Sequence, residues 1–223
     1  MANDLSWVDE FIAEATGKPT AHGSLVVALD ATASRQPTWD SASHLMGMMF
    51  KEVAAIGALE VQAVYFRGTS NVDAECKASN WMNDPVKLAA YMTGVTCRAG
   101  LTQIGRVFEH VLRESDKRKI NAMVYVGDSV EELRGNLVPL ARRLADQSIP
   151  IFLFQENDDP EAEQAFREIA KITGGAHCQF NQGSAAQLGE LLRAIALFAT
   201  GGIAALEQQG SSAAARFLLE QLR

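Results

Sequence analysis

The sequence predicts an α/β protein with a mainly parallel sheet of about six strands and helices on both faces. Apolar runs of strand length, typical of strands buried on both faces, lie at 25–29, 120–126 and 149–154. Segments with apolar side chains at three- and four-residue steps, the period of a helix, separate these runs. The apolar fraction of 48% in 223 residues is enough for a sizeable core. Strands that alternate with helices pair in parallel through right-handed crossovers.

In the first part of the chain the hydrophobic pattern changes repeatedly between helix and strand periods. The expected elements are a helix over 5–15, a strand over 25–29, a helix over 45–56, a strand over 61–66 and an edge strand over 73–79. The last segment is polar, which suits an exposed edge strand that forms a hairpin with the strand before it.

The rest of the chain continues the alternation. Asp84 and Pro85 begin a short helix that ends near Met92. The further expected elements are helices over 104–112, 133–147, 160–172 and 187–199, with strands over 120–126, 149–154 and 176–180. Glycines then set off two short helical segments, 203–206 and 213–222.

This pattern divides the chain into three parts. We expect an N-terminal helix and connector over 1–23, a single α/β domain over 24–199, and a C-terminal helical extension over 200–223 that packs on or next to the domain.

Composition limits the class of protein. The net charge of −7 argues against nucleic acid or an anionic membrane as the main partner, because both attract basic surfaces. We find no apolar run near the roughly 18 residues of a transmembrane helix, and the acidic segment 1–17 is unlike a signal peptide. Cys76, Cys97 and Cys178 are odd in number and far apart, which fits reduced thiols better than disulfides or a zinc site. We therefore expect a soluble, cytoplasmic protein.

Oxygen-bearing side chains follow the buried strands where these strands end. Asp30, Thr32 and Ser34 come directly after the first apolar run, Thr102 lies in a loop before a helix, and Asp128 follows the second apolar run. A reversal of strand order between the two runs would open a crevice above the sheet at that point. Carboxylate and hydroxyl oxygens suit a hard cation such as Mg²⁺.

These residues resemble the metal-ion-dependent adhesion site (MIDAS) of von Willebrand factor A domains. Asp30-Ala-Thr-Ala-Ser34 is similar to the D-x-S-x-S motif of the family, Gly100-Leu-Thr102-Gln-Ile104 to its G-x-T-x-[IL] segment, and Gly127-Asp128-Ser129 to its T-D-G loop. Segments 147–152 and 169–175 are similar to a later strand and a Thr-Gly-Gly turn, so that the resemblance covers roughly 24–199. Thr32 in place of serine and Gly127 in place of threonine are departures, and neither removes a ligand oxygen.

The resemblance implies a three-layer α/β/α, Rossmann-like sandwich with one antiparallel edge strand, and a binding protein rather than an enzyme. It implies that Thr32, Ser34 and Thr102 hold Mg²⁺ (or Mn²⁺ or Ca²⁺) directly, with Asp30 and Asp128 bound to the ion directly or through water. A glutamate or aspartate of a partner protein would complete the coordination. Intracellular bacterial members of the family imply an adaptor or scaffold, with an ATPase or chaperone-like assembly as the partner.

Residues next to these ligands are predicted to form a rim that contacts the partner. They are Arg35, Gln36, Trp39, Gln103 and Ser129. Arginine and aromatic side chains are common in binding surfaces.

Two other functions remain open. Asp30-x-Thr-x-Ser34 and the acidic segment 128–132 also resemble haloacid-dehalogenase-type phosphotransferases, in which Asp30 would attack phosphorus with help from Mg²⁺ and a lysine. Lys117 and Lys119 precede the 120–126 strand, a position that does not suit this role. The second alternative is a von Willebrand factor A scaffold that holds no metal.

Each candidate side chain also has a purely structural interpretation. Asp30 suits a carboxylate that caps the turn after its strand, and Thr102 suits the N-cap of the helix that begins near Ile104. Glu131 and Glu132 are expected to stabilise the start of the following helix through its dipole.

Overall fold

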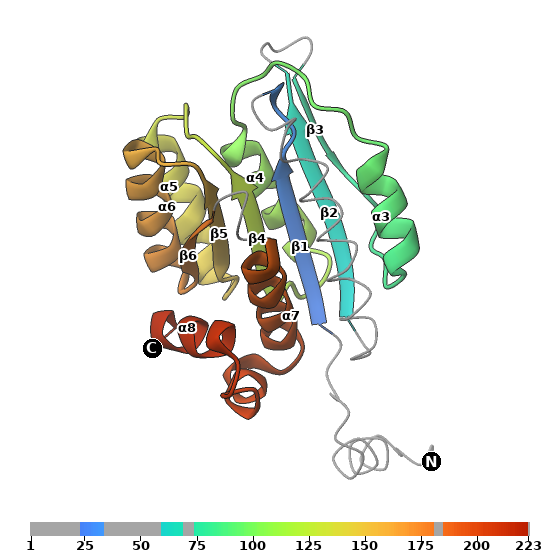
Figure 1. Cartoon of the computed structure of the whole chain (residues 1–223). Helices are drawn as coiled ribbons and strands as arrows, with labels where there is room; N and C mark the ends of the chain where they lie inside the picture. Colours follow the sequence, from blue (N-terminus) through green and yellow to red (C-terminus); the bar gives the residue numbers. More distant parts are fainter. Residues whose placement is uncertain (1–22, 34–58, 69–73, 181–184, 223) are drawn as a thin grey trace, which may run out of the picture.

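The computed structural model describes residues 23–33, 59–68, 74–180 and 185–222 of the chain (Figure 1). The helices expected over 5–15 and 45–56 lie outside these residues, as do Ser34, Arg35, Gln36 and Trp39.

A six-stranded mixed sheet forms the middle layer, in the order β3-β2-β1-β4-β5-β6 (Figure 1). The strands are β1 (Gly23–Asp30), β2 (Leu59–Arg67), β3 (Glu75–Ala78), β4 (Ala122–Gly127), β5 (Ile151–Glu156) and β6 (Ala176–Phe180). Strand β3 pairs antiparallel with β2, and the other pairings are parallel. The predicted parallel sheet with one antiparallel edge strand is confirmed. Strand β1 lies between β2 and β4, and the strand order therefore reverses beside it.

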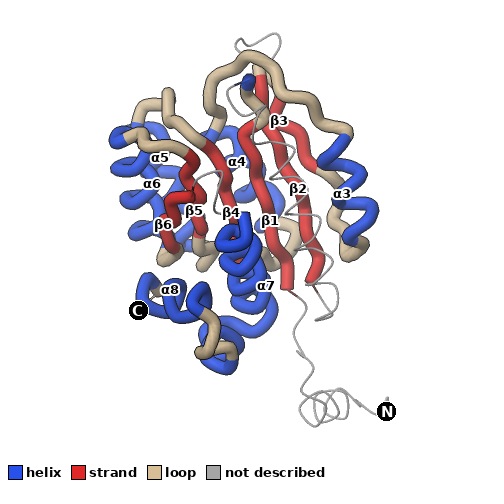
Figure 2. The backbone as a smooth tube through the Cα atoms, viewed as in Figure 1, coloured by secondary structure: helices blue, strands red, loops and turns tan. Residues whose placement is uncertain are grey.

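Helices cover both faces of the sheet (Figure 2). They are α3 (Pro85–Thr93), α4 (Ile104–Ser115), α5 (Arg134–Asp146), α6 (Pro160–Thr173), α7 (Ala185–Gln208) and α8 (Ala213–Gln221). Leu25, Val27 and Leu29 of β1 share one apolar cluster with α3, α7 and α8. Val26 and Ala28 face the other side and share a second cluster with α4, α5 and α6. Because alternate side chains enter opposite clusters, the continuous apolar run of β1 is buried on both faces.

Two helices begin where an aspartate precedes a proline. The Asp84 carboxylate accepts hydrogen bonds from the backbone N–H groups of the second and third residues of α3. Asp159 does the same for the second and third residues of α6. The proline after each aspartate lacks the N–H that would be unpaired at a helix start. This local chemistry explains why both starts were predicted within one residue.

Helix α7 consists of two helical segments that meet at a kink at Gly202, whose backbone is non-helical (φ 64°, ψ −156°). The predicted glycine break before the 203–206 segment is therefore confirmed, and that segment continues to Gln208. Within Gln187–Gln208 an 18-residue window has a mean hydropathy of 1.4, so that by length and composition this segment could cross a membrane, which corrects the expectation that no segment approaches that length. Leu191 and Ile195 are buried in the core, and a core helix meets the same criterion.

Half-buried His110 and buried His177 predict that the protein loses stability as the pH falls. The ring of His110 hydrogen-bonds Gln62 (2.8 Å) and that of His177 hydrogen-bonds Gln155 (2.9 Å). Burial lowers the pKa of both rings from the ordinary histidine value. As the pH falls below that ordinary value, of about 6.5, the unfolded chain takes up protons before the folded protein does, and stability is lost.

We therefore expect the urea midpoint of unfolding to fall between about pH 6.5 and pH 5, before most carboxylates titrate. Unfolding curves of His110→Gln and His177→Gln measure the contribution of each ring. Each variant should show a shallower loss over this range than the parent protein. An unchanged pH dependence in both variants would contradict the assignment.

Candidate functional site

The loop between α3 and α4 crosses the carboxyl ends of β1 and β2. The Arg98 N–H donates to the Ala31 carbonyl (3.0 Å), and the Leu101 N–H donates to the Gly68 carbonyl (3.2 Å). These bonds extend the sheet beyond the ends of both strands. They bring Thr102, the next residue in the chain, to the edge at which β1 ends. The loop itself can be followed over this edge in Figure 1.

Asp30 is the last residue of β1 and is fully buried. Its Oδ1 atom accepts a hydrogen bond from the Thr32 N–H (2.7 Å), which fixes the turn after the strand. Thr32 is also buried and forms an isolated parallel bridge with Arg98. The turn-capping interpretation of Asp30 is therefore correct.

Arg67 fixes the same loop from the end of β2, a role that the sequence analysis missed. Its guanidinium donates to the carbonyl and hydroxyl of Thr96 and to Glu75 (2.8 Å). It also lies over the Tyr65 ring, 5.2 Å from the centroid. Hydrogen bonding to Arg67 lowers the pKa of Glu75. The sequence signal for this role is Arg67 itself, a cation that directly follows the apolar run 61–66.

Thr102 joins its loop to the one that follows β4. Its backbone N–H donates to Glu131 Oε2 (2.8 Å), and its hydroxyl oxygen accepts from the Glu131 N–H (3.0 Å). Thr102 is buried, and Glu131 lies only three residues after Asp128. The loops that carry Thr102 and Asp128 are therefore hydrogen-bonded to each other.

Glu132 strengthens this connection at the start of α4. Its carboxylate accepts from the N–H groups of Ile104 (2.5 Å) and Gly105 (2.9 Å), the first two residues of that helix. Burial raises the pKa of Glu132, although hydrogen bonds from these N–H groups and from the Thr102 hydroxyl oppose the rise.

This arrangement corrects the expectation for the acidic pair. Glu131 and Glu132 bind the residues at the start of α4, and not the start of α5, which directly follows them in sequence. No side chain caps α5, whose N-cap residue is Leu133. The Thr102 side chain is likewise not the N-cap of α4, because Gln103 occupies that position.

Asp128 follows β4 at the same edge and is half-buried. Within the parts of the chain that the structure describes, its buried Oδ1 atom has no hydrogen-bond partner. A buried carboxylate oxygen is costly unless a hydrogen bond or a cation compensates it. Because parallel β1 and β4 are neighbours, Asp30 and Asp128 lie at adjacent strand ends.

The two predicted rim residues inside the described ranges have different surroundings. Gln103 is buried, and its amide donates to the Arg67 carbonyl (2.9 Å) and accepts from Arg106 (2.7 Å). It therefore lies in the interior of the loop and not on an exposed rim. Ser129 is half-buried and donates to Glu131 Oε1 (3.2 Å).

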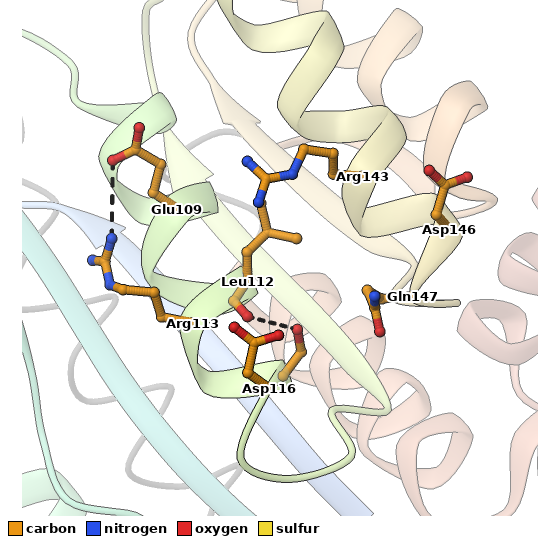
Figure 3. A pocket seen from close by; sticks show the side chains of 8 residues that line it. Glu109, Leu112, Arg113, Asp116, Arg143, Asp146 and Gln147 are labelled. Atoms are coloured by element: carbon orange, nitrogen blue, oxygen red, sulfur yellow. Dashed lines mark hydrogen bonds and ion pairs between the residues drawn. The ribbon is translucent and has the colours of Figure 1, made fainter.

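A hollow of about 460 Å³ lies at the other end of α4, where α4 and α5 both end (Figure 3). Its lining mixes cations and anions, namely Glu109, Arg113, Asp116, Arg143 and Asp146. The Arg113 and Glu109 side chains form an ion pair (4.0 Å) within it. This hollow is separate from the edge that carries Asp30, Thr102 and Asp128.

Comparison with known proteins places the fold. No protein-family model matches the chain, and no curated protein does. By contrast, 142 chains of solved structures match. The SpRpn10 VWA domain aligns over 75% of this chain and 94% of its own length, with a TM-score of 0.60 and 12% identity. A von Willebrand factor type A protein from Catenulispora acidiphila aligns over 79% of this chain and 42% of its own, with a TM-score of 0.64 and 14% identity.

The chain has the von Willebrand factor A fold. An aerotolerance-related membrane protein from Bacteroides fragilis also matches, over 74% of this chain and 95% of its own, with a TM-score of 0.57 and 19% identity. Identities this low establish a shared fold alone. The function must therefore be argued from the side chains of this chain.

In this von Willebrand factor A fold, the edge that carries Asp30, Thr102 and Asp128 suits a hard cation. The donor set consists of carboxylate and hydroxyl oxygens, the ligands that Mg²⁺ prefers. The buried Asp128 Oδ1 atom would gain a compensating positive charge. Among the described residues, no three histidine, cysteine, aspartate or glutamate side chains gather as metal ligands, and hydroxyl oxygens would therefore have to contribute.

Proposed function

We propose that this protein is a metal-dependent protein-binding domain whose ion lies at the carboxyl edge of β1 and β4. The residues that would hold Mg²⁺ are Asp30, Thr32, Ser34, Thr102 and Asp128. The observation that carries this proposal is the pairing of two buried or half-buried carboxylates at adjacent strand ends, with the loop of Thr102 hydrogen-bonded to the loop that follows Asp128. Mn²⁺ and Ca²⁺ share the same preference for oxygen ligands.

The bound ion would supply a positive charge that attracts a carboxylate. A glutamate or aspartate of a partner protein is therefore the group that we expect to be recognised, since a charge-assisted contact of this kind is strong where little water surrounds it. An adaptor that binds an ATPase or chaperone-like assembly in the cytoplasm is the role that we propose for the domain.

The positions of Lys117 and Lys119 weigh against the phosphotransferase alternative. That mechanism needs a lysine near Asp30 to balance charge. Lys117 and Lys119 precede β4, at the opposite edge of the sheet from Asp30, and Lys117 forms an ion pair with Glu114 (2.6 Å).

The proposal predicts that Mg²⁺ stabilises the folded protein. A ligand at about 100 times its Kd adds about 2.7 kcal/mol to the free energy of unfolding, which for a chain of this size raises the Tm by about 5–10 °C. Thermal unfolding with and without Mg²⁺ measures the effect. Asp30→Ala and Thr102→Ala should lose it.

Asp146→Ala is the matched control, because it removes a carboxylate from the hollow at the opposite edge. It should keep the full response to Mg²⁺. A parent protein whose Tm does not respond to Mg²⁺, Mn²⁺ or Ca²⁺ would favour the metal-free scaffold. A partner that stays bound in a pull-down when a chelator is added would contradict metal-dependent recognition.

A further inference from the structure

The inference concerns the acidic pair after Asp128, and it rests on the proposed function. We propose that Glu131 and Glu132 are positioning residues that orient the Thr102 hydroxyl toward the ion. Neither carboxylate needs to touch the ion for this role. Their place in the sequence, just before α5, predicts a role at the start of that helix instead.

The Thr102 hydroxyl has a limited hydrogen-bonding capacity. Such a group offers one proton and two lone pairs, in three directions. One lone pair of Thr102 Oγ1 accepts the Glu131 N–H (3.0 Å), while the Glu131 carboxylate holds the Thr102 N–H (2.8 Å). The backbone and the side chain of Thr102 are thus both held by Glu131, and the second lone pair of Oγ1 remains for a metal ion.

The same dipeptide also fixes the position of the Thr102 backbone. Glu131 Oε2 accepts the Thr102 N–H (2.8 Å), and Glu132 accepts the N–H groups of Ile104 and Gly105. Four hydrogen bonds thus join residues 102–105 to residues 131–132. Because Asp128 lies on the same loop as the dipeptide, two ligands from separate segments are kept at a fixed spacing.

The two carboxylates hold different parts of this segment. Glu132 accepts with both oxygens, from the Ile104 N–H and the Gly105 N–H, and so fixes the start of α4 just after Thr102. Residues that orient metal ligands typically change metal affinity 10–100-fold. Glu131 contributes its backbone N–H to the hydroxyl, so that its side chain acts only on the Thr102 backbone. Substitutions at the two positions should therefore have different effects.

Isothermal titration of the full chain with MgCl₂ tests the inference. We expect Glu132→Gln to bind Mg²⁺ at least about tenfold more weakly, because the amide supplies one acceptor oxygen where the carboxylate supplies two. Glu132→Asp keeps the charge and should recover part of the affinity. Glu131→Gln keeps an acceptor for the Thr102 N–H and should bind nearly as the parent protein does.

The control is Glu168→Gln, which removes the same charge from an exposed position on α6, where Glu168 pairs with Arg134. It should leave Mg²⁺ affinity unchanged. Urea unfolding in EDTA measures stability separately, so that titrations are made only where every variant is folded. In the same metal-free samples, scalar couplings of the Thr102 side chain should show a single χ1 rotamer in the parent protein and averaging in Glu132→Gln.

The outcomes separate this inference from the proposed function. Equal Mg²⁺ affinity in Glu132→Gln and the parent protein, with or without a loss of stability, would overturn the positioning role and leave the metal site intact. A parent protein that binds no Mg²⁺ would overturn both. Weaker Mg²⁺ binding in Glu132→Gln, partial recovery in Glu132→Asp and no change in Glu168→Gln would support the positioning role.

Discussion

Substitution of Gly175 by alanine is expected to lower the free energy of unfolding by at least about 3 kcal/mol. Gly175 lies between α6 and β6, where its N–H donates to the Ala170 carbonyl (2.9 Å). A Cβ atom at this position would lie 1.9 Å from the Ile151 carbonyl oxygen and 2.5 Å from the Ile151 carbonyl carbon. Both atoms belong to the backbone of β5 and cannot move aside as a flexible side chain would. Urea unfolding of Gly175→Ala measures the loss.

The chain offers a glycine control for this experiment. Gly189 lies in α7, and among the described residues beyond the adjoining helix backbone no atom would lie within 4 Å of an added Cβ there. Gly189→Ala should therefore stabilise the protein by about 0.5–1 kcal/mol, the usual gain for alanine inside a helix. Similar stabilities for Gly175→Ala and Gly189→Ala would show that the close approach of Gly175 to β5 does not determine the cost.

Gly127→Thr, which restores the residue found in the T-D-G loop, is expected to destabilise this protein by about 2–3 kcal/mol. A Cβ at Gly127 would lie 2.8 Å from Tyr125 Cε1 and 2.9 Å from the Tyr125 hydroxyl oxygen. The Tyr125 ring is fully buried, stacked on Phe66 (centroids 5.9 Å apart) and in edge contact with Phe166 (5.6 Å). Its neighbours therefore prevent it from moving away.

A double-mutant cycle checks this explanation. Tyr125→Val alone should cost several kcal/mol because it leaves a cavity beside Phe66. In Tyr125→Val/Gly127→Thr, the threonine meets no ring, and the double variant should be about 1–2 kcal/mol more stable than the sum of the single effects predicts. Strict additivity in urea unfolding would rule out the ring as the reason for glycine at 127. Asp128 follows directly, and we therefore expect Gly127→Thr also to weaken Mg²⁺ binding.

The regular elements of the fold were predictable because their determinants are local. The apolar runs of β1, β4 and β5 and the Asp-Pro starts of α3 and α6 depend on residues a few positions apart. The break inside α7 is local as well, because it lies at the predicted glycine Gly202. The packing of the segment after the break was not predictable in this way, since Leu206 shares its apolar cluster with residues of β1 and α8 that are distant or separate in the chain.

The sheet edge of the candidate residues was predictable, and the hydrogen bonds between their loops were not. The spacing of Asp30, Thr102 and Asp128 along the chain indicated that all three reach one edge of the sheet, and the fold brings the loops that carry them together there. The bonds from Glu132 to Ile104 and Gly105 join residues 27–28 positions apart. From the neighbouring residues alone, Glu132 is expected to act on α5, which begins two residues later. A short stretch of sequence does not show that the start of α4 lies beside Glu132 in the fold.

The position of β1 between β2 and β4 has a consequence for how the chain is made. Strand β1 is synthesised first but acquires its second neighbour only after β2, β3, α3 and α4 have been added. At typical rates of translation this takes several seconds, during which one edge of a mostly apolar strand has no partner from its own sheet. An unpaired apolar edge is prone to join other chains. Arrival of β4 therefore ends the interval in which a nascent chain is most exposed to aggregation, in the same step that brings Asp128 beside Asp30.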